Sequence, residues 1–145
     1  MWRSWLGLLV FLGFVDAAGA ADQFLCVSEQ STGFRWKDGT WRQEEFKVGE
    51  KYLVVAVPEY QHVGEKVNFE IRTFGSDKVE HRCWGDGPVS SEFGTRIMCG
   101  GVGYGLTMDT KSMRYQEVFS LGYVEGWDKP ESTPAITIGT CSRLN

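Results

Sequence analysis

The residues of this chain that could perform acid–base or nucleophilic chemistry are few and scattered. The 145 residues include two histidines, His62 and His81, and neither lies in a local catalytic motif such as G-x-S-x-G. Hydrolysis needs a nucleophile, a base and an orienting group that the fold brings together. The sequence therefore predicts no catalytic residue, and it leaves open a small envelope hydrolase that uses His62 or His81 with a carboxylate.

Paired carboxylates, which carry out glycoside hydrolysis, are a second possible chemistry. Glu44 and Glu45 are adjacent, and adjacent side chains of a strand point to opposite faces. No other pair stands out, and the separation that such a mechanism needs depends on the folded structure.

Four glycines between Gly100 and Gly105 have the composition of a phosphate-binding loop. The dinucleotide fingerprint G-x-G-x-x-G fails, because Leu106 occupies the last glycine position and no helical pattern follows. The phosphate-loop motif fails as well, since no Gly-Lys-Ser or Gly-Lys-Thr occurs. We predict no cofactor, and we interpret the cluster as a bend inside one strand, residues 97–107, of a curved sheet.

The four cysteines predict two structural disulfides. Cys83 and Cys99 flank one turn-rich segment, whereas Cys26 and Cys141 lie toward the two ends of the chain that remains after export. We therefore expect the pairs Cys83 with Cys99 and Cys26 with Cys141, of the three pairings that four cysteines allow. No C-x-x-C spacing indicates a metal site or a redox pair, so no metal is predicted.

The first 20 residues have the layout of a secretory signal peptide. Arg3 precedes an apolar run of about 11 residues, too short to span a membrane, and cleavage is expected between Ala20 and Ala21. We expect residues 21–145 to form one domain with no stable membrane anchor, exported to the bacterial periplasm or outside the cell. An oxidising compartment agrees with the two predicted disulfides.

The charge pattern argues against nucleic acid as a partner. The net charge is -4, and the acidic and basic residues are interspersed along the chain. A nucleic-acid binder needs a basic stripe that neutralises phosphates, and this sequence has none.

Strand periodicity dominates the chain. In VNFEIRT, Val67, Phe69 and Ile71 share one face, and in MRYQEVFSLGY an apolar face is interrupted only by Glu117. Asp38-Gly39 predicts a two-residue hairpin that sets Trp36 opposite Trp41. The same register sets Arg35 opposite Arg42, which is unfavourable.

The predicted fold is all-β: a single small antiparallel β-barrel or sandwich of about eight strands, stapled by disulfides. We favour the barrel, because a bridge between the first and last strands suits closure. The expected strands are residues 23–28, 34–36, 41–46, 51–57, 67–74, 79–84, 97–107 and 113–124, with 136–141 as a possible ninth. Further turns are expected near residues 75–77, 85–88 and 109–112.

Aromatic side chains in polar surroundings give a candidate binding surface. Trp127 and Tyr60 lie in expected loops with His62, and Trp84 adjoins a cysteine. Such groups anchor proteins, glycans or small apolar ligands. The alternative is that they pack locally, as a pair of tryptophans or a cover over a disulfide.

Several short motifs resemble those of small exported bacterial proteins that have no established activity. They are Phe24-Leu25-Cys26, Gly33-Phe34, Trp41, Phe46, Lys51-Tyr52-Leu53, Cys83, Cys99, Gly122-Tyr123 and the run from Thr133 to Cys141. The resemblance implies an exported protein and no particular residue roles. In architecture alone the chain also looks like the small periplasmic lysozyme inhibitors, which are disulfide-stapled barrels. We expect an exported, non-enzymatic binding or envelope-accessory protein.

Overall fold

The structure is a computed structural model that describes residues 22–85 and 95–144. The expected signal peptide, its cleavage site at Ala20 and Ala21, and most of the turn expected at residues 85–88 lie outside this part of the chain. Within it, no helix is long and apolar enough to cross a membrane.

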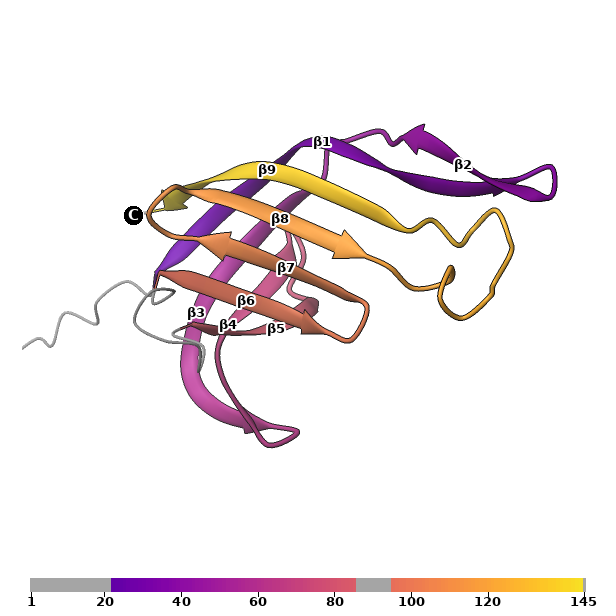
Figure 1. Ribbon diagram of the computed structural model, residues 1–145. Helices are drawn as coiled ribbons and strands as arrows, with labels where there is room; N and C mark the ends of the chain where they lie inside the picture. The colour runs from indigo at the N-terminus through magenta and orange to yellow at the C-terminus, as the bar shows by residue number, and fades with distance from the viewer. Residues whose placement is uncertain (1–21, 86–94, 145) are drawn as a thin grey trace, which may run out of the picture.

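Nine antiparallel strands form one sheet that closes on itself (Figure 1). The order is β2-β1-β3-β4-β5-β6-β7-β8-β9, and a further pairing of β1 with β9 closes eight of the strands into a barrel. β2 stays outside this ring, paired to β1. The predicted all-β fold is confirmed as a barrel. The strands are β1 Gln23–Lys37, β2 Thr40–Glu45, β3 Lys51–His62, β4 Glu65–Thr73, β5 Val79–Gly85, β6 Arg96–Gly101, β7 Tyr104–Asp109, β8 Arg114–Phe119 and β9 Ala135–Leu144.

β1 is one long strand, where the sequence predicted two short ones. Its first half pairs with β3 and its second half with β2, while β9 runs along the opposite edge from Gln23 to Gly33. A bulge between Ser28 and Gln30 shifts the register midway, and such bulges bend a strand. The hairpin of β1 and β2 consequently projects beyond the ring of eight strands (Figure 1).

The hairpin register is the predicted one. Asp38 and Gly39 both have positive φ, 52° and 79°, as a type I′ turn requires. Trp36 lies opposite Trp41, with the ring centroids 5.6 Å apart in an edge-on arrangement. Arg35 lies opposite Arg42, as expected.

The glycine cluster is a hairpin, so the predicted single bent strand over residues 97–107 is wrong. β6 ends at Gly101, the chain turns at Val102 and Gly103, and β7 returns from Tyr104. Gly100 has φ 105° and lies opposite Gly105, where a Cβ on Gly100 would come within 2.5 Å of the Gly105 Cα. The two strands can therefore approach this closely only because neither residue has a side chain.

The strand expected over residues 113–124 is also shorter in the structure. β8 starts at Arg114, after Met113 takes a positive φ of 56°, and it ends at Phe119. The following loop is fixed by Gly122, whose φ is 102° and whose missing Cβ would lie 2.6 Å from the Ser132 Cβ. Backbone geometry, rather than the apolar alternation, ends this strand.

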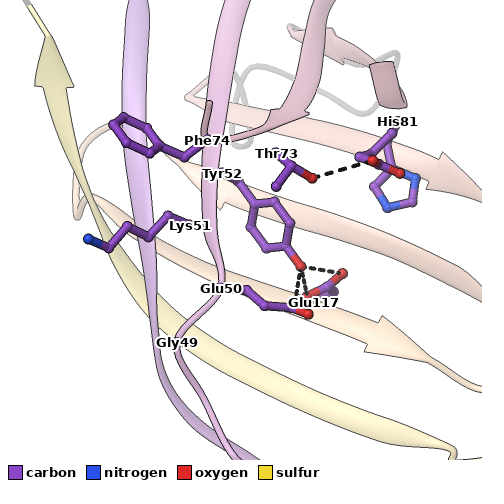
Figure 2. Close-up of a pocket in the computed structure, with 9 residues that line it drawn as sticks. Gly49, Glu50, Lys51, Tyr52, Thr73, Phe74, His81 and Glu117 are labelled. Atoms are coloured by element: carbon purple, nitrogen blue, oxygen red, sulfur yellow. Dashed lines mark hydrogen bonds between the residues drawn. The ribbon is translucent and has the colours of Figure 1, made fainter. Parts of the chain in front are cut away.

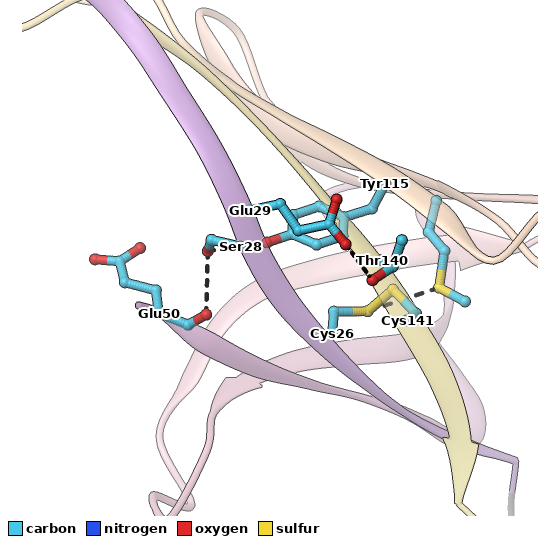
Figure 3. The surroundings of a disulfide bond; sticks show 8 residues. Cys26, Ser28, Glu29, Glu50, Tyr115, Thr140 and Cys141 are labelled. Carbon is cyan, nitrogen blue, oxygen red and sulfur yellow. Dashed lines mark hydrogen bonds between the residues drawn. A yellow bond between two sulfur atoms is a disulfide. The ribbon is translucent and has the colours of Figure 1, made fainter. Parts of the chain in front are cut away.

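Both predicted disulfides are confirmed. Cys26 and Cys141 lie directly opposite each other on β1 and β9 (Figure 3). Cys83 lies opposite Cys99 on β5 and β6. The first bridge joins residues 115 positions apart in the sequence and so ties together the strands that close the barrel.

The inward-facing side chains form an apolar core. Ile71 from β4, Leu106 from β7 and Cys26 from β1 are all 1% exposed or less. Phe69 packs against them, which confirms the shared face of Val67, Phe69 and Ile71. The remaining members of this core are Phe24, Tyr52, Val54, Cys83, Ile97, Cys99, Met108, Tyr115 and Cys141.

Candidate functional site

A hollow that opens to solvent carries polar side chains next to the apolar core. A cavity of about 600 Å³ lies where β3 and β5 begin, β4 ends and β8 passes (Figure 2). We call this cavity the mouth. Its lining residues are Gly49, Glu50, Lys51, Tyr52, Thr73, Phe74, Glu80, His81 and Glu117. The volume falls within the range of small-molecule sites, about 300 to 1,000 Å³.

Tyr52 stands between two carboxylates of the mouth. Its hydroxyl forms a short hydrogen bond with Glu50, and its oxygen lies 3.2 Å from Oε2 and 3.4 Å from Oε1 of Glu117 (Figure 2). A phenol has a single proton to donate. When it donates to Glu50, Glu117 can complete its own hydrogen bond to the same oxygen only by carrying a proton.

Burial governs the ionisation of these groups. It raises the pKa of Glu117 above the usual 4.5; the contact with the Tyr52 hydroxyl opposes this rise, and the nearby charge of Glu50 adds to it. Burial, together with the hydrogen bond to Glu50 and the charge of Glu117, also raises the pKa of Tyr52 far above its usual value. The phenol thus remains a hydrogen-bond donor at every physiological pH.

A hydrogen-bonded chain holds Glu50 at the rim of the mouth. The backbone carbonyl of Glu50 accepts hydrogen bonds from the Ser28 hydroxyl at 3.0 Å and the Ser28 amide at 3.2 Å. Ser28 in turn accepts one from the Tyr115 hydroxyl at 3.0 Å (Figure 3). Since Ser28 and Tyr115 are buried in the barrel wall, the segment before β3 is fixed where its carboxylate meets Tyr52.

His81 brings an imidazole to the same cavity. It lies on β5 opposite Ile71, and its ring centroid is 5.4 Å from that of Tyr104. Burial lowers the pKa of His81, partly offset by the charge of Glu80. Its Nδ1 is buried and makes no hydrogen bond within the described residues. The side chain is therefore a neutral imidazole at neutral pH.

The rim of the mouth carries charges of both signs. Glu80 accepts hydrogen bonds from Lys78 at 3.1 Å and from Thr73 at 3.3 Å, and the bond from Lys78 lowers its pKa. Lys51 lines the cavity as well. Within residues 22–85 and 95–144, no group of three or more His, Cys, Asp or Glu side chains could hold a metal ion.

The residues of the predicted binding surface do not gather in one place. Trp127 is 49% exposed in the loop between β8 and β9. Tyr60 and His62 lie at the far end of β3, and Tyr60 donates a hydrogen bond of 2.9 Å to Glu70. Trp84 is half-buried on β5 beside the disulfide cysteine Cys83. None of these four lines the mouth.

Of the two histidines, the structure places His81 in the concave site and His62 on an exposed hairpin end. The other mouth residues were not singled out from the sequence as a site. One signal did exist: Glu117 interrupts an otherwise apolar strand face, and it points inward between Tyr115 and Phe119. A charged residue at an inward position is costly unless it is paired, and so it marks a functional candidate.

A cluster of aromatic side chains supports the projecting hairpin of β1 and β2. Trp41 contacts Tyr123 edge-on at 5.4 Å, and its indole N–H donates to Asp128 at 3.1 Å. These contacts join the hairpin to the loop between β8 and β9. Trp36 and Trp41 therefore pack locally, which was the alternative to a binding role for the aromatic residues.

No family model, curated protein or solved structure matches this chain.

Proposed function

We propose that the chain is an exported, non-enzymatic binding protein that takes a small polar ligand into the mouth. The observation that carries this proposal is the joint placement of Glu50, Tyr52 and Glu117 on the wall of a cavity of about 600 Å³. Ligand sites are typically concave, with an apolar body and a few convergent polar groups. Here the rings of Tyr52 and Phe74 supply the apolar part of the lining, and the carboxylates supply the polar groups.

The lining favours a ligand that offers hydrogen-bond donors. Glu50, Glu80 and Glu117 present carboxylates, whereas the ammonium group of Lys51 points away from Glu50 and Glu117 (Figure 2). An ammonium, guanidinium or hydroxyl group can take the place of the contact between Tyr52 and Glu117. Export to the periplasm or the cell exterior is part of the proposal, and two disulfides are consistent with such an oxidising compartment.

Equilibrium titration of the oxidised protein with butylammonium, butylguanidinium and a neutral polyol tests this function. We expect Glu117→Gln and Tyr52→Phe each to weaken binding of the probe that binds best about tenfold, because each removes a polar partner. Glu131→Gln, on an exposed loop residue that does not line the mouth, should leave affinity unchanged. If the mouth variants bind every probe as the wild type does, the proposal fails.

A small hydrolase is the second candidate function, and the position of His81 in the mouth supports it. His81 lines the same cavity as Glu80 and Glu117, which is the concave setting that a catalytic base needs. The hydroxyl of Thr73, the aliphatic alcohol of the lining, donates to Glu80. Turnover of chromogenic esters or glycosides that disappears in His81→Ala would replace binding with catalysis.

The lysozyme-inhibitor-like alternative rests only on a shared architecture, a disulfide-stapled barrel. A direct assay of lysozyme inhibition by the oxidised protein decides it.

A further inference from the structure

The outer edge of β2 is an unpaired strand edge. β2 pairs with β1 on one side, and no backbone hydrogen bond reaches its other side from residues 22–85 or 95–144. β1 pairs with three strands, and each of the other seven strands of the ring pairs with two. Unpaired edges are templates for another strand, and this one lies on the hairpin that projects beyond the barrel (Figure 1).

The ladder of the hairpin determines which backbone groups face outward. In a two-residue hairpin the residues that flank the turn form a hydrogen-bonded pair, and such pairs then alternate along the strands. Arg42 and Glu44 accordingly bond to β1, and the amides and carbonyls of Trp41, Gln43 and Glu45 point away from it. Two bonds agree with this alternation. The Phe34 amide, opposite Gln43, donates instead to Pro134 at 2.8 Å. The Glu44 carbonyl faces β1, where it accepts a hydrogen bond from the Thr32 side-chain hydroxyl at 3.4 Å.

We infer that this edge pairs with β2 of a second copy of the chain, antiparallel, with Gln43 opposite Gln43 on a two-fold axis. In this register each residue whose amide and carbonyl point away from β1 lies opposite another such residue. Gln43 lies opposite Gln43, and Trp41 lies opposite Glu45. Arg42 then lies opposite Glu44 of the second copy in a non-hydrogen-bonded pair, where side chains are closest. Closed two-fold pairing of one surface with itself is the commonest form of oligomer.

The charges of β2 are complementary in this register. Within one chain Glu44 already pairs with Arg35 at 2.5 Å, whereas Arg42 faces Arg35 and reaches Asp38 only at 3.8 Å. Pairing of two copies would place each Glu44 between Arg35 of its own chain and Arg42 of the other. This arrangement offsets the like-charge contact between Arg35 and Arg42.

Other registers lack this agreement. A shift of one residue places each residue with outward-pointing amide and carbonyl opposite a residue of the other copy whose amide and carbonyl already bond to β1. The hydrogen bonds between the two copies then cannot form. Centring the pair on Trp41 sets Arg42 opposite Thr40, and centring it on Glu45 brings two carboxylates face to face. Charged side chains usually protect an edge from pairing. Here the charged side chains of β2 disfavour a partner strand whose charges do not match, and they are complementary to those of β2 in a second copy.

Charge exchange across the axis tests the inference. Arg42→Glu places a carboxylate opposite Glu44 of the second copy, and Glu44→Arg places a guanidinium opposite Arg42 of the second copy. Either change should raise the dissociation constant of the dimer about tenfold or more. An equal mixture of the two variants restores two opposite-charge pairs and should regain wild-type association. Sedimentation equilibrium of the oxidised protein over a range of concentrations measures this.

Lys111→Glu, which makes the same charge change on the exposed turn between β7 and β8, should not affect association. Far-ultraviolet circular dichroism confirms that each variant is folded. A wild-type protein that remains monomeric throughout, or that forms mixed complexes only with a foreign strand, would overturn the inference. A dimer that neither β2 variant weakens, or a mixture that fails to reassociate, would overturn it as well.

Discussion

At the scale of single residues, the mouth is defined by one phenol between two carboxylates. Tyr52 donates its proton to Glu50 and leaves Glu117, on the inner wall, without a donor unless Glu117 is itself protonated. Burial favours the same outcome, because it penalises the charged form of Glu117. A cationic or hydroxyl-bearing ligand would supply the missing donor, which is why the site suits such ligands.

This ionisation has a measurable effect on stability. The folded protein holds the Glu117 proton more tightly than the unfolded chain does, because the folded pKa is raised above 4.5. The stability from protonated Glu117 is thus present below the unfolded pKa and is lost as pH rises through the folded value. The free energy of unfolding of Glu117→Gln should therefore rise relative to that of the wild type as pH rises from about 4 to about 8. The gain is about 1.4 kcal/mol for each pH unit by which the folded pKa of Glu117 exceeds its unfolded pKa.

Urea unfolding of both proteins at a series of pH values measures the difference, with Glu131→Gln as the control. A difference between wild type and Glu117→Gln that stays constant across this range would contradict the assignment.

At the scale of strands and turns, the features that could be predicted from the sequence are those that depend on a few neighbouring residues or on cysteine positions. Asp38-Gly39 predicted the hairpin and its register, and the cysteine positions predicted both bridges. The turn at Val102 and Gly103 escaped prediction because strand-like residues flank it, so that the alternation continues through it in the sequence. Whether glycines 100 to 105 bend one strand or join two depends on the pairing of β6 with β7, which is set by the barrel around them.

The close approach of β6 and β7 should make Gly100 far less tolerant of a side chain than its neighbour. Gly100→Ala combines a φ of 105° with a Cβ 2.5 Å from the opposite backbone, and we expect it to cost roughly 2 kcal/mol or more of unfolding free energy. For Gly101→Ala the nearest atom is the Tyr104 hydroxyl oxygen at 3.6 Å, so its cost should stay below about 1 kcal/mol. Equal urea midpoints for the two variants would refute this account of the hairpin.

At the scale of the whole molecule, barrel closure creates the candidate site. Glu50, His81 and Glu117 are far apart in the sequence, and they line one cavity because β3, β5 and β8 all face the same interior. Strand periodicity could assign Glu117 to an inner face. It could not show that Glu50, in the segment before β3, would reach the same point, because the Ser28 and Tyr115 contacts that hold it depend on the closed ring.

Closure also separates the aromatic residues first considered for binding. Trp127 lies in the loop between β8 and β9, whereas Tyr60 and His62 lie at the far end of β3. Tyr60 has a partner of its own, since its hydroxyl and Arg72 both donate to Glu70 and hold the pKa of that carboxyl low against the effect of burial. A binding role for the mouth therefore needs no contribution from these side chains.

The most direct test of the binding site is to locate ligand contacts on the isotopically labelled, oxidised protein by amide chemical-shift mapping. With the best-binding probe from the titration, we predict that the largest shifts fall at Glu50 to Tyr52, Thr73, Glu80, His81 and Glu117, and that they vanish in Glu117→Gln. Shifts confined to Tyr60, His62, Trp84 and Trp127, with the mouth undisturbed, would contradict the central claim that the mouth is the binding site.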